Sequence, residues 1–343
     1  MNRRLFLTAA LALAAGAAPA HAQAVADFYR GRTVELLIGY TTGGGYDTYA
    51  RLVARHLGPF IPGKPNIVVR NLPGGGGRVL MGHMMNVAPK DGSVLATADQ
   101  SLPLAQAMRD PGILFDAKAF NWIGNPAADN NTVVTWHTTG VTSIEEARKK
   151  EVVVASTGPN TSSQIPYAMN ATLGTKFKVV SGYPGGNEMN MSMENGETGA
   201  RGSNPWSTWK ATKPDWIRDR KINIIAQVGL TRAPDLPHVP LITDLATNED
   251  DRAALRLLSA PAAVGRPYFT TPGVPAERVK ALREAFSAME KDAAFLEEAK
   301  KLGLEINPVS GEDLQKIVAD IVDTPVKIAE RLNQIIAPSD GAK

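Results

Sequence analysis

The chain of 343 residues contains no cysteine. Disulfides, thiolate metal sites and a cysteine nucleophile are therefore excluded. An excess of charge of one sign is also missing, because 37 basic residues nearly balance 34 acidic ones. This balance argues against a nucleic-acid partner. Beyond the N-terminal segment, no apolar run is long enough for a membrane helix.

Motifs of catalysis and metal binding are equally scarce. The chain has no G-x-S-x-G nucleophile elbow, and its five histidines never stand at H-x-x-x-H spacing, which argues against zinc. Asp47 is the one acidic residue beside a glycine-rich loop, and the sequence offers no partner that would tune its pKa for proton transfer. We expect Asp47 to cap a helix and order the loop. We expect no catalytic residue, no metal and no cofactor.

The N-terminal segment, residues 1–22, has the pattern of a signal peptide. A basic start precedes an apolar stretch over residues 5–18, and residues 20–22 (AHA) form an A-x-A cleavage site. Residues 2–7 (NRRLFL) also resemble a twin-arginine export motif, so the general secretory and twin-arginine routes both stay open. Either route takes the mature chain, cleaved after Ala22, out of the cytoplasm.

The stretch that organises the rest of the chain covers residues 34–57. Its pattern predicts a strand over 34–38, a glycine-rich loop at Gly43, Gly44 and Gly45, and then a helix. Backbone N–H groups and the positive end of the helix dipole would converge at the loop and favour an anion. Flanking hydroxyl groups can add donors, namely those of Thr41, Thr42, Tyr46 and Thr48.

Nucleotide-binding interpretations of this loop are unsupported, because it is neither G-x-x-x-x-G-K-[ST] nor G-x-G-x-x-G. A purely structural interpretation stays open, in which the glycines only permit a tight turn and Asp47 caps the helix. A second unit follows, with a strand over 66–70, glycines at 74–77 and a helix over 79–87. In open parallel α/β sheets, ligands bind at the edge where such loops follow strands.

Residues 40–99 resemble the Bug/TctC family, the periplasmic substrate-binding proteins of tripartite tricarboxylate transporters. Its pattern combines a Gly-Gly-x-x-Asp loop, a helical Ala-Arg, a Val-Val-x-Asn-x-Pro-Gly-x-Gly-Gly segment and a Pro-x-Asp-Gly turn. The corresponding parts here are Gly43–Asp47, Ala50-Arg51, Val68–Gly77 and Pro89–Gly92. Residues 233–240 (APDLPHVP) also resemble a turn of the family, and the resemblance extends over nearly all of the mature chain.

The resemblance implies an α/β fold of two lobes, like that of periplasmic binding proteins, with each lobe a sheet flanked by helices. A ligand cleft lies between the lobes, which would close on each other like a Venus flytrap. The first lobe would be discontinuous, made of residues 23–124 plus 232–343, and the second lobe would cover 125–231. We expect a strand over 264–267 where the chain returns to the first lobe.

The resemblance also implies a set of ligand-binding residues on both sides of the cleft. From the first lobe these are Tyr40, Thr41, Thr42, Gly43, Gly44, Gly45, Tyr46, Asp47 and Arg78. From the second lobe they are Thr157, Gly158, Thr161, Ser162, Tyr183, Arg201 and Asn204.

The residues themselves leave alternatives open for several of these roles. Thr161 and Ser162 can equally cap the helix that follows them. A guanidinium can hold a carboxylate bidentately, so Arg201 or Arg78 would suit an acidic group, although either can be a solvated surface residue. We expect the tryptophans at 206, 209 and 216 to pack the second lobe rather than stack on a ligand.

The function implied is capture of a small organic carboxylate in the periplasm and delivery to integral-membrane transporter subunits. We expect the protein to be a monomer. An exported enzyme that acts on a small anion is an alternative, and so is a binding lobe that signals to a sensor kinase. The identity of the carboxylate is not encoded in any motif of the chain.

Overall fold

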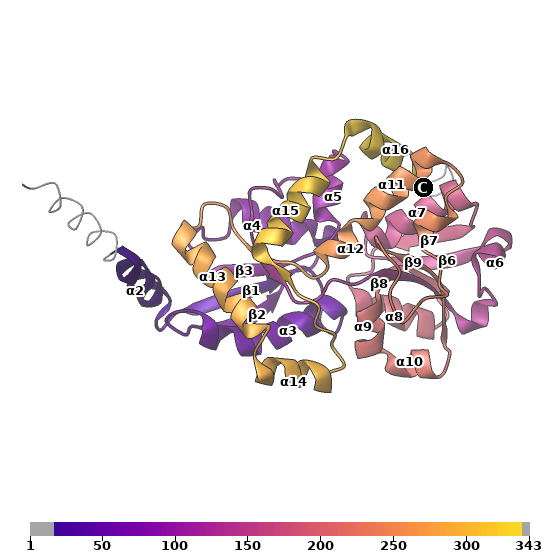
Figure 1. Cartoon of the computed structure of the whole chain (residues 1–343). Coiled ribbons are helices and arrows are strands. Elements are labelled where there is room, and N and C mark those ends of the chain that lie inside the picture. Colours follow the sequence, from indigo (N-terminus) through magenta and orange to yellow (C-terminus); the bar gives the residue numbers. More distant parts are fainter. Residues whose placement is uncertain (1–16, 338–343) are drawn as a thin grey trace, which may run out of the picture.

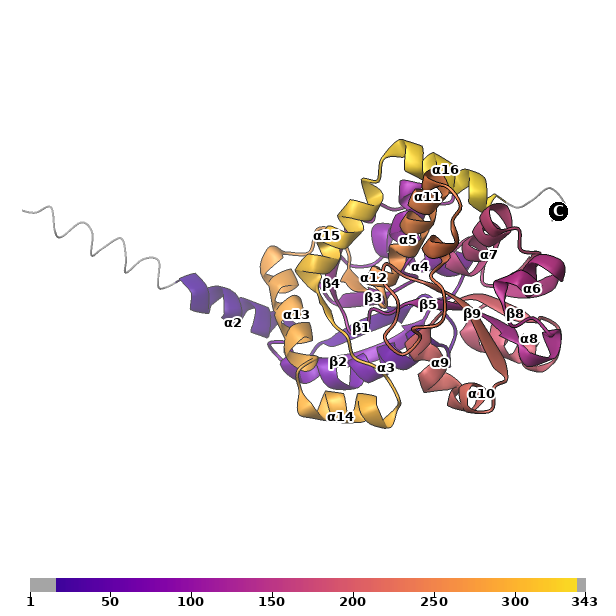
Figure 2. The same cartoon turned by 45° about the vertical axis from the view of Figure 1, so that its right-hand side comes forward.

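The computed structural model describes residues 17–337, and within them it folds into two lobes joined side by side (Figure 1). Each lobe has a central sheet with helices on both faces, as Figure 2 shows from a second direction. The predicted two-lobe α/β fold is confirmed. Residues 1–16 of the predicted signal peptide lie outside the described residues. Helix α2 (Ala17–Tyr29) runs through the predicted cleavage point.

The first lobe is organised on a six-stranded sheet with the order β11-β4-β10-β3-β1-β2. Strands β3, β1 and β2, which form one side of the sheet, run parallel to one another, whereas β10 and β11 run antiparallel to their neighbours. The bounds are β1 (Thr33–Ile38), β2 (Asn66–Asn71), β3 (Val94–Thr97), β4 (Asn121–Asn125), β10 (Tyr268–Thr270) and β11 (Val309–Ser310).

The second lobe is organised on a five-stranded sheet with the order β7-β6-β8-β5-β9. Strands β7, β6 and β8 are parallel, and β5 pairs antiparallel with both β8 and β9. The bounds are β5 (Asn131–Trp136), β6 (Val152–Ser156), β7 (Phe177–Ser181), β8 (Ala200–Pro205) and β9 (Ile222–Val228).

Helices cover both sheets. In the first lobe and its C-terminal part they are α3 (Gly45–Leu57), α4 (Arg78–Asn86), α5 (Leu102–Ala107), α11 (Glu249–Ser259), α12 (Pro261–Val264), α13 (Ala276–Met289), α14 (Ala293–Lys301), α15 (Gly311–Val322) and α16 (Val326–Ile336). In the second lobe they are α6 (Ile144–Lys149), α7 (Thr161–Leu173), α8 (Gly186–Glu194), α9 (Trp206–Thr212) and α10 (Pro214–Arg218).

The strands divide between the two sheets as the predicted lobes do, but two C-terminal helices do not stay with the first lobe. Helices α11 and α16 pack on each other and against α7 of the second lobe (Figures 1 and 2). An ion pair of 2.5 Å between Arg331 and buried Asp251 joins the two helices. The chain from α11 onward therefore spans both lobes.

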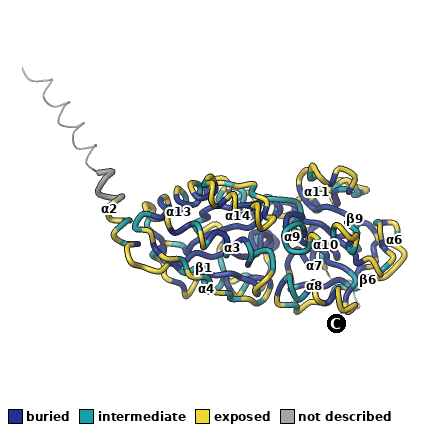
Figure 3. Tube along the Cα trace, turned by 90° about the horizontal axis from the view of Figure 1, so that it is seen from below, coloured by how far each residue is buried: buried dark blue, intermediate teal, exposed yellow. Residues whose placement is uncertain are grey.

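Each lobe buries an apolar core between its sheet and its helices (Figure 3). In the second lobe, Trp209 and Trp216 are almost completely buried and pack with Trp136, so the expectation that these tryptophans are structural is confirmed. Ser143 caps the N-terminus of α6, because its hydroxyl accepts a hydrogen bond from the Glu146 amide at 3.2 Å.

Two local predictions differ from the structure. The strand expected over 264–267 is displaced to β10, because residues 261–264 form the short helix α12 and Gly265 turns the chain with a φ of 63°. Strand β8 was not predicted at all, since its sequence ARGSNP lacks an alternation of apolar residues. The strand forms through its pairing with β5 and β6 on either side.

Glu290, at the end of α13, is a buried carboxyl group without a cationic partner. Its side chain is 8% exposed and its Oε1 atom has no hydrogen-bond partner in the described chain. Burial raises its pKa from 4.5 to about 8, and the nearby Lys291 offsets only part of this. The folded protein therefore holds a proton on Glu290 at neutral pH that the unfolded chain releases.

We predict that Glu290→Gln stabilises the protein at pH 8 and has little effect near pH 5. Between pH 4.5 and 8 the wild-type folded state binds one proton more than the unfolded state, so its unfolding free energy falls as pH rises. The difference in unfolding free energy between Glu290→Gln and the wild type should grow by about 1.4 kcal/mol per pH unit in this window. Urea unfolding at several pH values measures it. The matched control is Glu277→Gln, at an exposed position of the same helix, which should show no such pH dependence.

Candidate functional site

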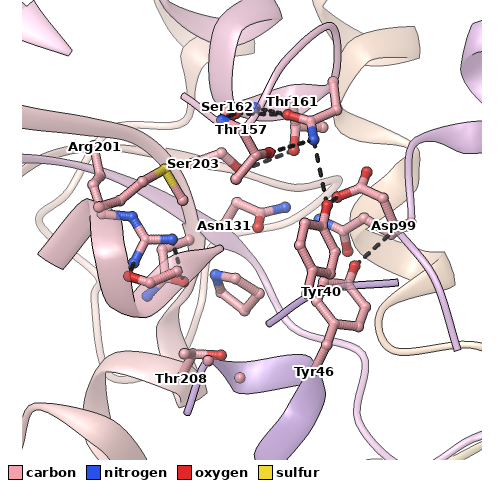
Figure 4. Close-up of a pocket in the computed structure, with 18 of the residues that line it drawn as sticks. Tyr40, Tyr46, Asp99, Asn131, Thr157, Thr161, Ser162, Arg201, Ser203 and Thr208 are labelled. Atoms are coloured by element: carbon pink, nitrogen blue, oxygen red, sulfur yellow. Dashed lines mark hydrogen bonds between the residues drawn. The ribbon is translucent and has the colours of Figure 1, made fainter. Parts of the chain in front are cut away.

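The loops that follow β1, β2 and β3 meet at one edge of the first sheet, because these strands are parallel and adjacent. The loop after β6 and the carboxyl end of β8 face them from the second lobe. A cavity of about 60 Å³ lies between the two lobes at this place. Figure 4 shows its walls, with Tyr40 and Tyr46 on one side and Arg201 on another.

The cavity wall combines polar and apolar groups from both lobes. The first-lobe sheet and its loops contribute Tyr40, Gly43, Gly44, Gly45, Tyr46, Asp99, Gln100 and Arg266, and Asn131 lies where the chain enters the second lobe. The second lobe contributes Thr157, Asn160, Thr161, Ser162, Gly186, Met189, Asn190, Arg201, Ser203, Asn204, Pro205, Thr208 and Thr212.

Asp47 orders the loop after β1, as the sequence predicts, but the expected capping role is wrong, because α3 begins after Gly44 with no side-chain cap hydrogen bond. Its carboxylate accepts hydrogen bonds from the Gly43 amide at 3.0 Å, from Arg51 at 2.9 Å and from the Asn71 side chain at 2.9 Å. Burial raises its pKa, but these three partners outweigh burial and lower the pKa below its ordinary value. The Gly43 amide is thereby engaged. Within residues 17–337, the amides of Gly44 and Gly45 at the start of α3 donate to no protein acceptor.

Two stacked tyrosines form the first-lobe wall. The rings of Tyr40 and Tyr46 lie 5.0 Å apart between centroids, with an interplanar angle of 23°. The Tyr40 hydroxyl donates to buried Asp99 at 2.5 Å, and the Tyr46 hydroxyl accepts from the Gln100 amide at 2.9 Å. Burial raises the pKa of both tyrosines well above 10, so both stay protonated.

In the loop after β6, the polar side chains bond mainly to one another. Asn160 caps α7 by accepting hydrogen bonds from the amide and hydroxyl of Ser162, at 3.0 and 2.6 Å. The Ser162 hydroxyl in turn accepts from the Thr157 amide at 3.1 Å. Asn160 also donates across the cavity to the Tyr40 hydroxyl at 3.3 Å. The loop is thus both a helix cap and part of the cavity wall.

Arg201, on β8, is a buried cation whose nearest partners are all neutral. Its side chain donates to the side-chain oxygens of Asn190 at 2.8 Å and Asn204 at 3.1 Å, and its guanidinium lies 5.0 Å from the ring centre of Trp209. It forms no ion pair with a carboxylate in the described part of the chain. Burial lowers its pKa to about 9, so the guanidinium stays charged at neutral pH.

Two donors at this end of the cavity lack acceptors. The Nε atom of Arg201 and the Nδ2 atom of Asn204 are buried and have no partner among the described residues. By contrast Arg266, the other cation in the wall, pairs with Asp129 at 3.1 Å and donates to the Ser207 and Thr208 hydroxyls. The charge of Arg266 is therefore compensated within the protein, whereas that of Arg201 is not.

Six of the residues implied by the family resemblance do not line the cavity. Thr42 is exposed, and the Thr41 hydroxyl donates to Glu188 at 3.0 Å. Arg78 is held by Asp110 at 2.5 Å and by the Pro159 carbonyl at 2.6 Å, so it is not available to a second acidic group. The other residues implied by the resemblance line the cavity. The six that do not are Thr41, Thr42, Asp47, Arg78, Gly158 and Tyr183.

The sequence analysis missed several residues of the wall. Asp99 and Gln100 follow β3, so the same rule that pointed to the loops after β1 and β2 would have found them. Asn160 could have been found as the N-cap of α7. Asn131 and Arg266 come from distant segments and carry no local signal. Their place in the site depends on how the lobes join.

The lobes are held together at the mouth of the cavity by contacts between loops. Thr41 bonds to Glu188, Arg78 to the Pro159 carbonyl, and Tyr40 to Asn160. The loop after β7 approaches so closely that a Cβ atom on Gly185 would overlap the Thr41 hydroxyl. Gly185 has an extended backbone that any residue can adopt, so this approach is what requires glycine there.

We predict that Gly185→Ala holds the lobes further apart, because its methyl group would displace Thr41 and break the Thr41–Glu188 bond. Small-angle X-ray scattering should report a larger radius of gyration than for the wild type. Adding Thr41→Ala removes the overlapping hydroxyl and should restore part of the compact form. Equal radii for Gly185→Ala and the wild type would contradict the prediction.

The fold is that of the two-lobe periplasmic binding proteins. No family model matches the chain. A curated protein of Cupriavidus necator, named UPF0065 protein in gbd 5'region, is 25% identical over 345 residues, covering 97% of this chain and 98% of the relative.

Three solved structures illustrate this likeness of fold. The periplasmic binding protein BugD is 20% identical, covers 90% of this chain and 98% of its own, and has a TM-score of 0.71. MatC from Rhodopseudomonas palustris with bound malate is 17% identical, with coverages of 89% and 99% and a TM-score of 0.69. A TctC solute-binding protein from Polaromonas is 18% identical, with coverages of 89% and 99% and a TM-score of 0.59. The resemblance to the Bug/TctC family is thereby confirmed.

Two further properties concern residues 17–337. None of the helices there has the length and apolar composition needed to cross a bilayer. No three His, Asp or Glu side chains in that part of the chain gather so as to hold a metal ion.

Proposed function

We propose that the protein is a periplasmic solute-binding protein that captures a small organic carboxylate between its lobes and delivers it to the membrane subunits of a tripartite tricarboxylate-type transporter. Binding and release, without a chemical step, would be its whole activity. The proposed lobes are residues 23–124 plus 232–343 and residues 125–231, with α11 and α16 bridging them. Export would remove residues 1–22.

The observation that carries this proposal is the uncompensated charge of Arg201 in the wall of the cavity. A buried cation is costly unless an anion pairs with it and its donors are satisfied. Here the anion would come from the ligand, whose oxygens would accept from Arg201 Nε and Asn204 Nδ2. The free amides of Gly44 and Gly45, at the positive end of the α3 dipole, lie on the same cavity.

The similar structures support the same chemistry. MatC was solved with malate, a small carboxylate, and BugD and the Polaromonas protein are called binding or solute-binding proteins. The described wall of the cavity offers hydrogen-bond donors and the uncompensated charge of Arg201. A carboxylate that bridges the lobes would stabilise the closed form over the open one.

We predict that small carboxylates raise the thermal unfolding midpoint of the mature protein once co-purified ligand has been removed by unfolding and refolding. A ligand at 100 times its dissociation constant adds about 2.7 kcal/mol to the unfolding free energy. A panel of organic acids and neutral sugars, screened by thermal unfolding, tests this. A shift caused by sugars and by none of the acids would contradict the proposal.

We predict that Arg201→Gln weakens binding of the best carboxylate at least 30-fold. Loss of a buried charge partner costs about 2–5 kcal/mol in such pairs, and 1.4 kcal/mol is a factor of ten. Isothermal titration calorimetry measures the change. The matched control is Arg256→Gln, at an exposed position of α11 away from the cavity, which should leave the affinity unchanged. An Arg201→Gln protein that folds and binds as tightly as the control would rule out this role of Arg201.

A further inference from the structure

We infer that the cavity selects a compact ligand with a single carboxylate and, at its other end, a hydrogen-bond donor such as an ammonium or hydroxyl group, and that it discriminates against dicarboxylates. This inference rests on the proposed function and adds the class of ligand to it. It follows from the unequal ends of the cavity and from its size.

The end that takes the carboxylate is defined by Arg201. Its unpartnered Nε and the unpartnered Nδ2 of Asn204 supply two buried donors. The start of α3 lies close by. A Cβ atom placed on Gly44 would lie 3.5 Å from the Gly186 amide nitrogen, and a Cβ atom placed on Gly186 would lie 3.6 Å from the Arg201 guanidinium. The positive charge, the helix N-terminus and the unpartnered donors are therefore gathered at one end.

The opposite end carries a negative charge. Asp99 is 7% exposed and lines the cavity, and Figure 4 shows it on the far side from Arg201. Its carboxylate accepts from the Tyr40 hydroxyl at 2.5 Å and from the amide and hydroxyl of Ser101 at 2.9 and 2.5 Å. It has no ion pair with a cation in the described chain, since Arg266 pairs with Asp129 instead.

These three hydrogen bonds leave Asp99 with capacity for one more donor, because a carboxylate offers about four lone-pair sites. An ammonium or hydroxyl group of the ligand would fill it. A second carboxylate there would face a buried like charge, and like charges brought together in a low dielectric strongly disfavour each other. A methyl group would leave the site unfilled. The charges of the wall therefore match a ligand with one anionic end.

The size of the cavity points the same way. Its volume of about 60 Å³ is less than half that of the roughly 150 Å³ cavity known to accommodate benzene. Tyr40 and Tyr46 close one side and Met189 and Pro205 line others, so a longer chain could enter only with the lobes further apart. A compact acid of a few non-hydrogen atoms fits the closed form.

Calorimetric titration of the refolded mature protein with matched acids tests the inference. Two pairs are compared, lactate with malate and alanine with aspartate, and in each pair the second acid has one carboxylate more. Propionate is added as an acid that has neither the hydroxyl nor the ammonium group. We expect lactate or alanine to bind at least tenfold more tightly than its dicarboxylate partner and than propionate. Malate or aspartate binding as tightly as its partner would overturn the inference and leave the proposed function standing. Binding of none of the acids would overturn both.

Asp99→Asn provides the second measurement, because it removes the charge and keeps an oxygen that can accept from Ser101. We expect the ratio of dicarboxylate to monocarboxylate affinity to rise at least tenfold. Alanine should lose more affinity than lactate, since an ammonium depends on the charge. The matched control is Asp320→Asn, at an exposed position of α15, which should leave the ratio unchanged. An unchanged ratio in folded Asp99→Asn would overturn the role of Asp99, and the wild-type titrations decide the ligand class whether or not this variant folds.

Discussion

The buried charge of Arg201 is the constraint on which the second-lobe side of the site depends. Removal of a guanidinium from water costs several kcal/mol unless polar partners replace the solvent. Asn190 and Asn204 supply neutral oxygens and Trp209 supplies a ring face, but none of them supplies a negative charge. The same arrangement leaves Arg201 Nε and Asn204 Nδ2 without acceptors. The wall therefore holds buried donors that no described protein group satisfies and that, in the proposed function, a bound anion would satisfy.

On the first-lobe side, one amide of the glycine-rich loop is already bonded within the protein and is not free for a ligand. The Asp47 carboxylate accepts from the Gly43 amide and from the side chain of Asn71, the last residue of β2, so it ties two neighbouring strand ends together. Of the three glycine amides, those of Gly44 and Gly45 are left without an acceptor among the described residues. The acidic residue inside the loop thus orders it and occupies one of the three glycine amides.

Much of the fold could be predicted from the sequence, because β1, β2, β3 and β6 are short apolar runs followed by turn signals. Strand β8 could not, since ARGSNP becomes a strand only between β5 and β6. In the site, the glycines were predictable from their local pattern. Thr41 and Thr42 do not line the cavity, which residue type could not reveal because it does not fix side-chain direction. Arg266 has no local signal, since its partners Asp129, Ser207 and Thr208 are distant in sequence.

The charged side chains at the two ends of the cavity come from different lobes, and in the proposed function this division would link recognition to closure. The positive end rests mainly on β8 of the second lobe, whereas Asp99 follows β3 of the first. A ligand that contacts only one end would bind an open lobe and gain nothing from closure. A ligand that satisfies both ends makes its full set of bonds only when the lobes meet, so its binding free energy favours the closed state. The direct bond from Asn160 to Tyr40 spans the same gap and is too weak alone to supply that preference.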